Sequence, residues 1–203
     1  MASQKASAES KLPQRRRGRE RVATLLAAGA AIFAERGYDA ATMTEIAARA
    51  GAAIGSLYQF FPTKASLADA LLEQYMRAVH AHLDGIAAQA PTMPLADLAD
   101  SLCHALVTMR SGNPALVVLI ESGNIDPAMI AAIRKDMRRR VGAILHGRAP
   151  GLPPAEQAAI ATAVLQMMKA AAAMNVDPTI AGRKAALKEM ARMLESYLRT
   201  RLA

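Results

Sequence analysis

The sequence predicts an all-α protein with a small N-terminal domain and a larger helical domain behind it. Hydrophobic residues make up 53% of the 203 residues, which is enough for a sizeable core, while aromatic residues make up only 3%. Alanine, leucine and methionine are abundant and favour helices, whereas β-branched and aromatic runs bounded by turns are scarce. Apolar residues also recur at three- and four-residue intervals. Together these observations predict about nine helices and no strand.

The N-terminal segment carries most of the chain's positive charge. Residues 1–21 hold seven basic side chains against two acidic ones, a net +5 out of the formal +8. Because residues 1–17 are small, polar and basic, we expect a disordered basic arm there. Its Arg15, Arg16 and Arg17 suit the backbone of a polyanion such as DNA. A solvated tail that contributes only solubility is the alternative.

The first helix of the small domain is expected to run from Arg19 to Gly37. Glycine ends a helix readily, because it adopts the left-handed conformation of a C-terminal cap without strain. The next helix is expected to start at Thr42, which has capping-box spacing to Glu45. Gly51 ends this helix after about two turns.

A second short helix is expected from about Ile54. Its inward face is predicted to carry Leu57, Phe60 and Phe61, which leaves the polar side chains outside. Two short helices joined by a glycine-containing turn form a helix-turn-helix, here over residues 42–61.

The second helix of such a motif lies in the major groove of DNA, and its outward face reads the bases. Ser56 and Gln59 can hydrogen-bond base edges, with glutamine favouring adenine. Gly55 removes bulk, so the backbone can approach DNA closely. This face has no Arg, Lys or Asn, so base discrimination would also depend on methyl contacts and DNA shape.

Other positions are expected to contact phosphates, which position a protein without reading the sequence. Tyr58 and Lys64 flank the outward face, while Thr42 and Thr44 present hydroxyl and amide groups at the positive end of a helix. The positions expected to contact DNA are Thr42, Thr44, Gly55, Ser56, Tyr58, Gln59 and Lys64.

Six further helices are predicted behind this motif, at boundaries marked by Thr63, by prolines and by Asp-Pro pairs. They are expected at about 64–88, 95–110, 115–122, 126–146, 155–174 and 178–202. The predicted organisation is therefore a helix-turn-helix domain over 18–65, followed by a sensing and dimerisation domain over 66–203.

Four stretches of the small domain closely resemble the N-terminal domain of TetR-family transcriptional regulators. The matching residues are Arg19-Glu20-Arg21, Ala30-x-x-Phe33-Ala34-Glu35-Arg36-Gly37-Tyr38, Thr42-x-x-x-Ile46-Ala47-x-x-Ala50-Gly51 and Leu57-Tyr58-x-x-Phe61-x-x-Lys64. This resemblance covers about residues 19–70. It implies an all-helical, two-fold homodimer that binds a palindromic DNA operator, and a C-terminal domain that binds a small-molecule effector and releases the DNA. It places DNA contacts at Thr44, Gly55, Ser56, Tyr58, Gln59 and Lys64.

The same resemblance places a dimer interface in the last two helices, at about 155–174 and 178–202. Their apolar residues exceed what one face of a single subunit needs. Packing within one subunit is the alternative. Two-fold symmetry would set the two recognition helices about 34–36 Å apart, one turn of DNA.

The effector is expected to be small and hydrophobic. Twelve methionines are present, and thioether side chains suit a permissive pocket, although they also fill helical cores. The candidate pocket residues are Cys103, Met109, Met137 and Met167. Because aromatic residues are so few, an aliphatic or small neutral ligand is expected rather than a flat cationic one.

The sequence carries no recognisable enzyme motif. Its four histidines lack metal-ligand spacing, and it has neither a phosphate-binding glycine loop nor a nucleophile elbow. We therefore expect a protein that is not an enzyme, with no cofactor and no metal. No uncharged apolar run approaches the ~20 residues that span a bilayer. A cytoplasmic protein with no membrane partner is expected.

These features predict a ligand-responsive transcriptional regulator, interpreted as a repressor. One alternative is an activator or dual regulator with the same DNA-binding mode. Another is a helical adaptor that binds protein and retains a vestigial helix-turn-helix.

Overall fold

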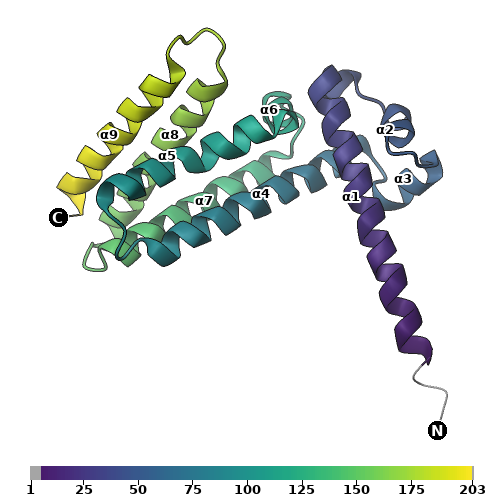
Figure 1. Cartoon of the computed structure of the whole chain (residues 1–203), viewed down its shortest axis with the longest axis horizontal. Helices are drawn as coiled ribbons and strands as arrows, with labels where there is room; N and C mark the ends of the chain where they lie inside the picture. Colours follow the sequence, from purple (N-terminus) through teal and green to yellow (C-terminus); the bar gives the residue numbers. More distant parts are fainter. Residues whose placement is uncertain (1–5, 203) are drawn as a thin grey trace. The chain divides into compact units, whose positions relative to one another are not determined.

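The computed structural model of the chain describes residues 6–202, with side chains from residue 16 onward. Within those residues it has nine helices and no strand, which confirms the predicted all-α class (Figure 1). The helices are α1 Ala6–Ala40, α2 Met43–Arg49, α3 Ile54–Phe60, α4 Lys64–Gln89, α5 Leu95–Gly112, α6 Pro114–Glu121, α7 Pro127–Arg148, α8 Pro154–Val176 and α9 Arg183–Arg201. The largest differences from the expected boundaries are at the starts of α1 and α9.

The chain forms two compact units. Unit 1 comprises the chain up to Leu72 together with Ala115–Ile125, and unit 2 comprises Glu73–Pro114 together with the chain from Asp126 onward. Unit 1 thus extends into α4 and includes α6. The functional boundary near residue 65, between a DNA-binding and a sensing domain, stays a prediction. Sequence patterns do not reveal this assignment, because it depends on packing between segments far apart in the chain.

Helix α1 begins earlier than expected. Residues 6–17, expected as part of a disordered arm, are helical, while residues 1–5 of that arm lie outside the described residues. Alanine, glutamate, lysine, glutamine and arginine dominate this stretch, and all are good helix formers. An ion pair of 3.0 Å from Arg16 Nε to Glu20 Oε1, one turn apart, supports the helix further.

Gly37 interrupts α1, as the sequence predicts. Its φ of 80° and ψ of 166° are not helical, so the chain bends there before one more turn ends at Ala40. A positive φ is strained for other residues but not for glycine.

Helix α9 begins later than expected. The sequence predicts a start at Pro178, but the first helical residue is Arg183. Asp177 Oδ1 accepts hydrogen bonds from the Thr179 amide at 2.8 Å and the Thr179 hydroxyl at 2.6 Å, which forms a turn instead of a helix cap. Gly182, with a φ of 68°, then delays the helix further.

The core of unit 1 lies where α1, α2, α3 and the start of α4 meet. Its fully buried large side chains include Leu25, Phe33, Ile46, Leu57 and Leu67. Gly29 allows α1 and α4 to approach each other, since a Cβ atom at this position would lie 2.9 Å from Leu67 Cδ2. Close packing therefore accounts for this glycine in the middle of a helix.

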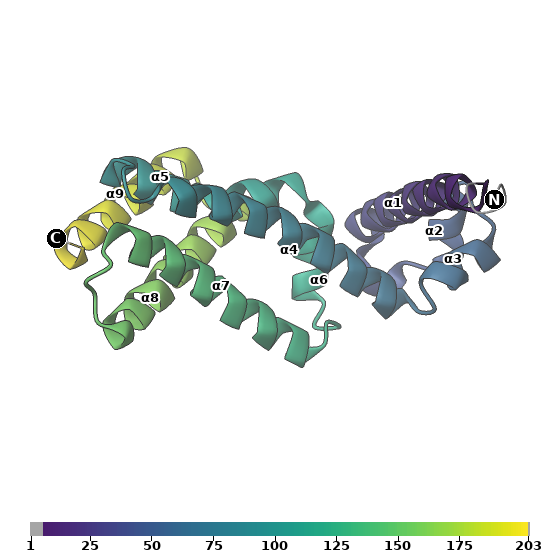
Figure 2. The same cartoon turned by 90° about the horizontal axis from the view of Figure 1, so that it is seen from below.

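In unit 2, α8 packs against α5, α7 and α9, and Figure 2 shows α7 and α8 crossing. Gln157 Nε2 of α8 donates a hydrogen bond of 2.6 Å to the Gly142 carbonyl of α7. The buried cluster that joins α5, α8 and α9 consists of Val107, Ala171, Ala172 and Leu187. By length and composition α8 is apolar enough to cross a membrane, but its residues Ile160, Val164 and Met168 are buried inside unit 2, as in a core helix.

Candidate DNA-binding interface and ligand pocket

The start of α2 is held by a complete capping box. Thr42 Oγ1 accepts a hydrogen bond from the Glu45 amide at 3.2 Å, and Glu45 Oε2 accepts from the Thr42 amide at 3.0 Å and from the Thr42 hydroxyl at 2.8 Å. These hydrogen bonds from Thr42 lower the pKa of Glu45. Both donors of Thr42 are therefore used inside the protein, which differs from its expected phosphate contact. Thr44, in the first turn, remains exposed.

Helix α3 turns its polar face outward, as expected. Leu57 is buried, and Phe61, which follows the helix in an extended conformation, is buried as well. Phe60, which was expected to face inward, is instead 40% exposed. Residues 57 and 61 are four apart and share one face, so Phe61 takes the inward place and Phe60 lies to the side.

The exposed surface of α3 contains the positions expected to meet DNA. Tyr58 is 48% exposed, Gln59 is exposed, and Ser56 is partly exposed. A Cβ atom at Gly55 would have no neighbour within 4 Å. The packing of unit 1 therefore does not require glycine there, whereas close approach of a partner would favour it.

Lys64 is placed differently from its expected position on a phosphate. Its Nζ donates hydrogen bonds to the carbonyl oxygens of Tyr38 at 2.7 Å, Asp39 at 3.0 Å and Ala41 at 3.0 Å. The same atom lies 4.6 Å from the centre of the Tyr38 ring, and that ring stacks on Phe33 at 5.5 Å. The ammonium group is thus engaged within unit 1.

The basic arm is only partly described. Arg16 pairs with Glu20, and Arg17 is exposed with no ion-pair partner among the side chains that the structure describes. Arg15 precedes residue 16, the first residue whose side chain the structure describes. Of the three arm positions, Arg17 is the described cation that is free to meet a phosphate.

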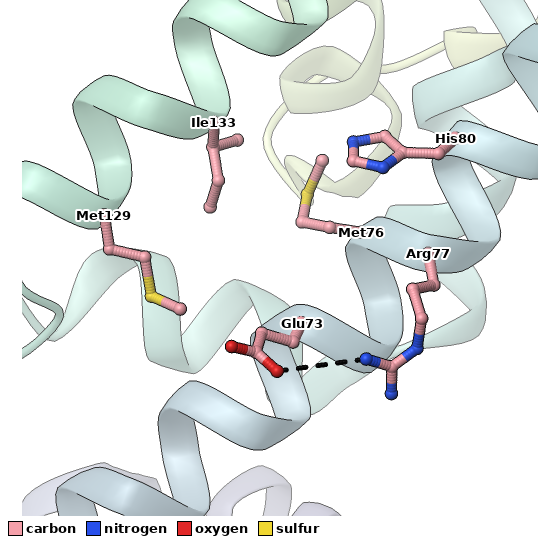
Figure 3. Close-up of a pocket in the computed structure, with 6 residues that line it drawn as sticks. All are labelled: Glu73, Met76, Arg77, His80, Met129 and Ile133. Atoms are coloured by element: carbon pink, nitrogen blue, oxygen red, sulfur yellow. Dashed lines mark ion pairs between the residues drawn. The ribbon is translucent and has the colours of Figure 1, made fainter.

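A pocket of about 250 Å³ lies in unit 2 between α4 and α7 (Figure 3). Met76 on α4 faces Met129 and Ile133 on α7 across it. Glu73 and Arg77, 3.8 Å apart as an ion pair, flank one side of this apolar surface. The sixth lining residue is His80.

The expected pocket residues are not among those six. Cys103 and Met137 are buried in the core of unit 2, and Met109 and Met167 are partly buried. Burial raises the pKa of the Cys103 thiol to about 11, so the thiol stays protonated near neutral pH. Methionine content indicates a pocket, but a single sequence does not show which methionines line it.

A charged network continues from the pocket along α7. His80 Nε2 lies 3.0 Å from Asp136 Oδ2, without the alignment of a hydrogen bond. Asp136 accepts hydrogen bonds from Arg140 Nε at 2.8 Å and from Arg139 at 2.6 Å and 3.1 Å. Arg140 also pairs with Asp84 of α4. The network therefore ties α7 to α4 beside the pocket.

Two pKa shifts follow from this network. Burial raises the pKa of Asp136, but the hydrogen bonds from Arg140 and Arg139 outweigh burial and hold it below its usual value. Burial and the charge of Arg140 lower the pKa of His80 despite the nearby carboxylate of Asp136. His80 is thus neutral near pH 7. No group of three His, Cys, Asp or Glu side chains able to hold a metal occurs among the described residues.

The fold and the exposed face of α3 define a helix-turn-helix DNA-binding protein. Residues 25–71 match the family model for bacterial regulatory proteins of the tetR family, and residues 94–198 match the one for the tetracyclin repressor-like C-terminal domain. The second match alone covers about half of the chain. The chain belongs to the TetR family of ligand-responsive, DNA-binding transcriptional regulators.

Individual relatives agree with this assignment. The HTH-type transcriptional activator FasR of Mycolicibacterium smegmatis is 42% identical over 67 residues, which cover 33% of this chain and 27% of FasR. The match thus spans about a quarter of that relative's length.

Solved structures share the fold over most of the chain. A tetR-family regulatory protein from Rhodococcus RHA1 is 24% identical, with a TM-score of 0.64 over 87% of this chain and 95% of that chain. FadR from Bacillus subtilis, solved in complex with stearoyl-CoA, is 14% identical, with a TM-score of 0.64 over 85% of this chain and 97% of that chain.

Proposed function

We propose that the protein is a cytoplasmic, dimeric repressor that binds a palindromic operator through residues 42–61 and is released by a small hydrophobic effector. The observation that carries the DNA-binding part is the face of α3. It combines an exposed Gln59 and a partly exposed Ser56 with a glycine that internal packing does not require. Such a face fits a major groove, where side chains hydrogen-bond base edges.

Recognition of base edges and binding of phosphates fall to different residues. Gln59 and Ser56 read base edges, because they are polar and lie on the outward side of α3. Tyr58 and Thr44 are placed to donate to phosphates, and Arg17 adds a charge that is free of ion pairs with described side chains. Phosphate contacts supply affinity, whereas base contacts supply specificity.

The effector we propose is amphipathic, with an apolar body and one polar end. Two methionines and an isoleucine line the pocket and suit an aliphatic chain. An ion pair flanks this apolar surface and suits a polar end. A volume of about 250 Å³ lies just below the usual range of ligand pockets, about 300–1,000 Å³, which favours a small ligand. FadR was solved with stearoyl-CoA, which makes fatty-acyl compounds of increasing length a rational first series for a binding screen.

The DNA-binding proposal predicts different effects for a reading residue and a holding residue. Gln59→Ala is expected to reduce the preference for operator over random DNA by about 1–3 kcal/mol. Arg17→Gln is expected to weaken binding to both DNAs similarly and to reduce the slope of log K against log salt by about 0.9. Fluorescence anisotropy with DNA from upstream of the protein's own gene measures both quantities.

Wild-type protein provides the decisive comparison in that assay. A specific regulator prefers its operator over random duplex at ~150 mM salt, typically by a large factor. An absence of any such preference would contradict the proposed regulator and favour a protein-binding adaptor. Identical behaviour of the two variants would contradict the division between reading and holding.

An activator is the second candidate function. The match to FasR supports it, because that relative is a transcriptional activator and is 42% identical over the matched 67 residues. Operator binding is the same in both cases, so in vitro transcription from the bound promoter separates them. A repressor lowers the transcript yield, and an activator raises it.

The dimer interface is proposed to involve α8 and α9. Met193 of α9 is 63% exposed, more than the other large hydrophobic residues found exposed in the described chain. Met193→Asp is expected to weaken the dimer by at least about 2 kcal/mol, because a charge in an apolar interface loses its hydration. Sedimentation velocity over a dilution series measures this effect, with Met193→Leu as the control. An unchanged dimer in the Asp variant would place the interface elsewhere.

A further inference from the structure

We propose that Lys64 acts as a positioning residue: its ammonium clamps residues 38–41 and thereby sets the start of α2 for DNA binding, without contacting a phosphate. This inference rests on the proposed DNA-binding function. It assigns Lys64 a role different from the one that its place beside the helix-turn-helix indicates.

The hydrogen-bonding capacity of the side chain supports this assignment. An ammonium group has three N–H donors and no acceptor. Lys64 directs them at three carbonyl oxygens, those of Tyr38, Asp39 and Ala41, at 2.7–3.0 Å. A phosphate contact would require at least one of these hydrogen bonds to break. The side chain is also partly buried, with Nζ over the face of the Tyr38 ring.

The position of Lys64 in its helix explains why the side chain points backward. It is the first residue of α4, and Cα–Cβ bonds in a helix tilt toward the N-terminus. A cation there also faces the positive end of the helix dipole, which is unfavourable. Three carbonyl dipoles compensate for this repulsion, so the arrangement is stable only with residues 38–41 in place.

The clamped segment joins a glycine to the N-cap of α2. It follows Gly37, whose φ of 80° lies where glycine is permissive, and it precedes Thr42, the N-cap of α2. The carbonyl of Ala41 is therefore held immediately before the cap. Without the clamp, α2 would keep its capping box but lose a fixed attachment to α4.

A second side-chain hydrogen bond to the same segment, from Asn124, provides a matched control. Asn124 Nδ2 donates to Asp39 Oδ1 at 3.3 Å, and both side chains are exposed. This single exposed hydrogen bond is much weaker than three hydrogen bonds from a cation. Asn124→Ala is therefore expected to change operator affinity and segment dynamics little.

Lys64→Arg separates the clamp from a phosphate contact, because it keeps the charge and changes the geometry. The planar guanidinium suits phosphates but does not direct three donors from one atom. We expect Lys64→Arg and Lys64→Met each to bind the operator about tenfold more weakly than wild type, with the salt slope of the Met variant unchanged although its charge is lost. Arg17→Gln, by contrast, is expected to lower the slope by about 0.9.

Amide hydrogen exchange of the DNA-free full-length protein provides the second readout. Exchange is expected to accelerate in residues 38–45 of both Lys64 variants, and to stay as in wild type in Asn124→Ala and Arg17→Gln. Wild-type affinity in Lys64→Arg, unchanged exchange in both Lys64 variants, or faster exchange throughout unit 1 would each overturn the proposal. If wild-type protein bound no DNA, the regulator function would fail, but the exchange experiment would still decide whether the clamp exists.

Discussion

Replacing Phe33 with alanine is expected to lower the free energy of unfolding by about 3–5 kcal/mol. Phe33 has no exposed surface and is among the largest fully buried side chains of unit 1. Its loss removes apolar burial and leaves a cavity that the surrounding helices fill only partly. It also removes the ring that stacks on Tyr38, which carries the Lys64 ammonium on its face.

Urea unfolding of the full chain, followed by circular dichroism, measures this change. Phe60→Ala is the matched control, because it removes the same group from the same unit at a 40% exposed position. Its expected cost is below about 1 kcal/mol. Because small domains are only marginally stable, Phe33→Ala is also expected to abolish DNA binding through loss of structure. Equal costs for the two variants would contradict the described core.

Asp136→Asn is expected to lower the free energy of unfolding by about 2–3 kcal/mol, the second-largest effect that we predict. The Asp136 side chain is only 29% exposed, and its partner Arg140 is 19% exposed. Asparagine preserves the size of the side chain but leaves both Arg140 and Arg139 without their shared carboxylate. The loss falls mainly on Arg140, which is little exposed and keeps only its pair with Asp84, whereas Arg139 is largely exposed.

The pH dependence of stability distinguishes this effect from a packing defect. The folded pKa of Asp136 lies below its ordinary value of 3.8, so its contribution is present above that pH and is lost as the pH falls through the folded pKa. The Asn variant should lack this dependence. An equally steep loss of stability below pH 4 in Asp136→Asn would assign the acid sensitivity to other carboxylates.

His80 causes a separate loss of stability at higher pH. Its folded pKa is lowered from 6.5, so the unfolded chain takes up a proton first and stability declines as the pH falls from 6.5 toward the folded pKa. His80→Gln should remove this step and leave the one below pH 4. Thermal melts of wild type and the two variants between about pH 2 and pH 8 separate the contributions.

Local signals made the helix-turn-helix predictable. The Thr42–Glu45 capping box, the glycine at position 51 and the four-residue spacing of Leu57 and Phe61 each act within one or two turns of helix. Interactions of this range are readable in a single sequence. Phe60, expected to face inward, is exposed because the helix ends there and the next residue, Phe61, turns inward instead.

Long-range contacts were not predictable in the same way. Lys64 has its carbonyl partners 23–26 residues earlier, and Asn124 meets Asp39 across 85 residues. The pocket depends on which methionines of α4 and α7 face each other. Many different pairings of apolar faces are compatible with one periodic pattern, so composition indicated a pocket without locating it.

The sequence by itself therefore determined the helical class, the position of the helix-turn-helix and its outward polar residues, because these depend on local spacing and capping. Only the tertiary structure decided that α6 joins unit 1, that the pocket lies between α4 and α7, and that Lys64 faces backbone carbonyls. The physical reason is the same in each case. Those features arise where distant segments pack together, and the free energy that selects one packing is shared among residues that no local pattern connects.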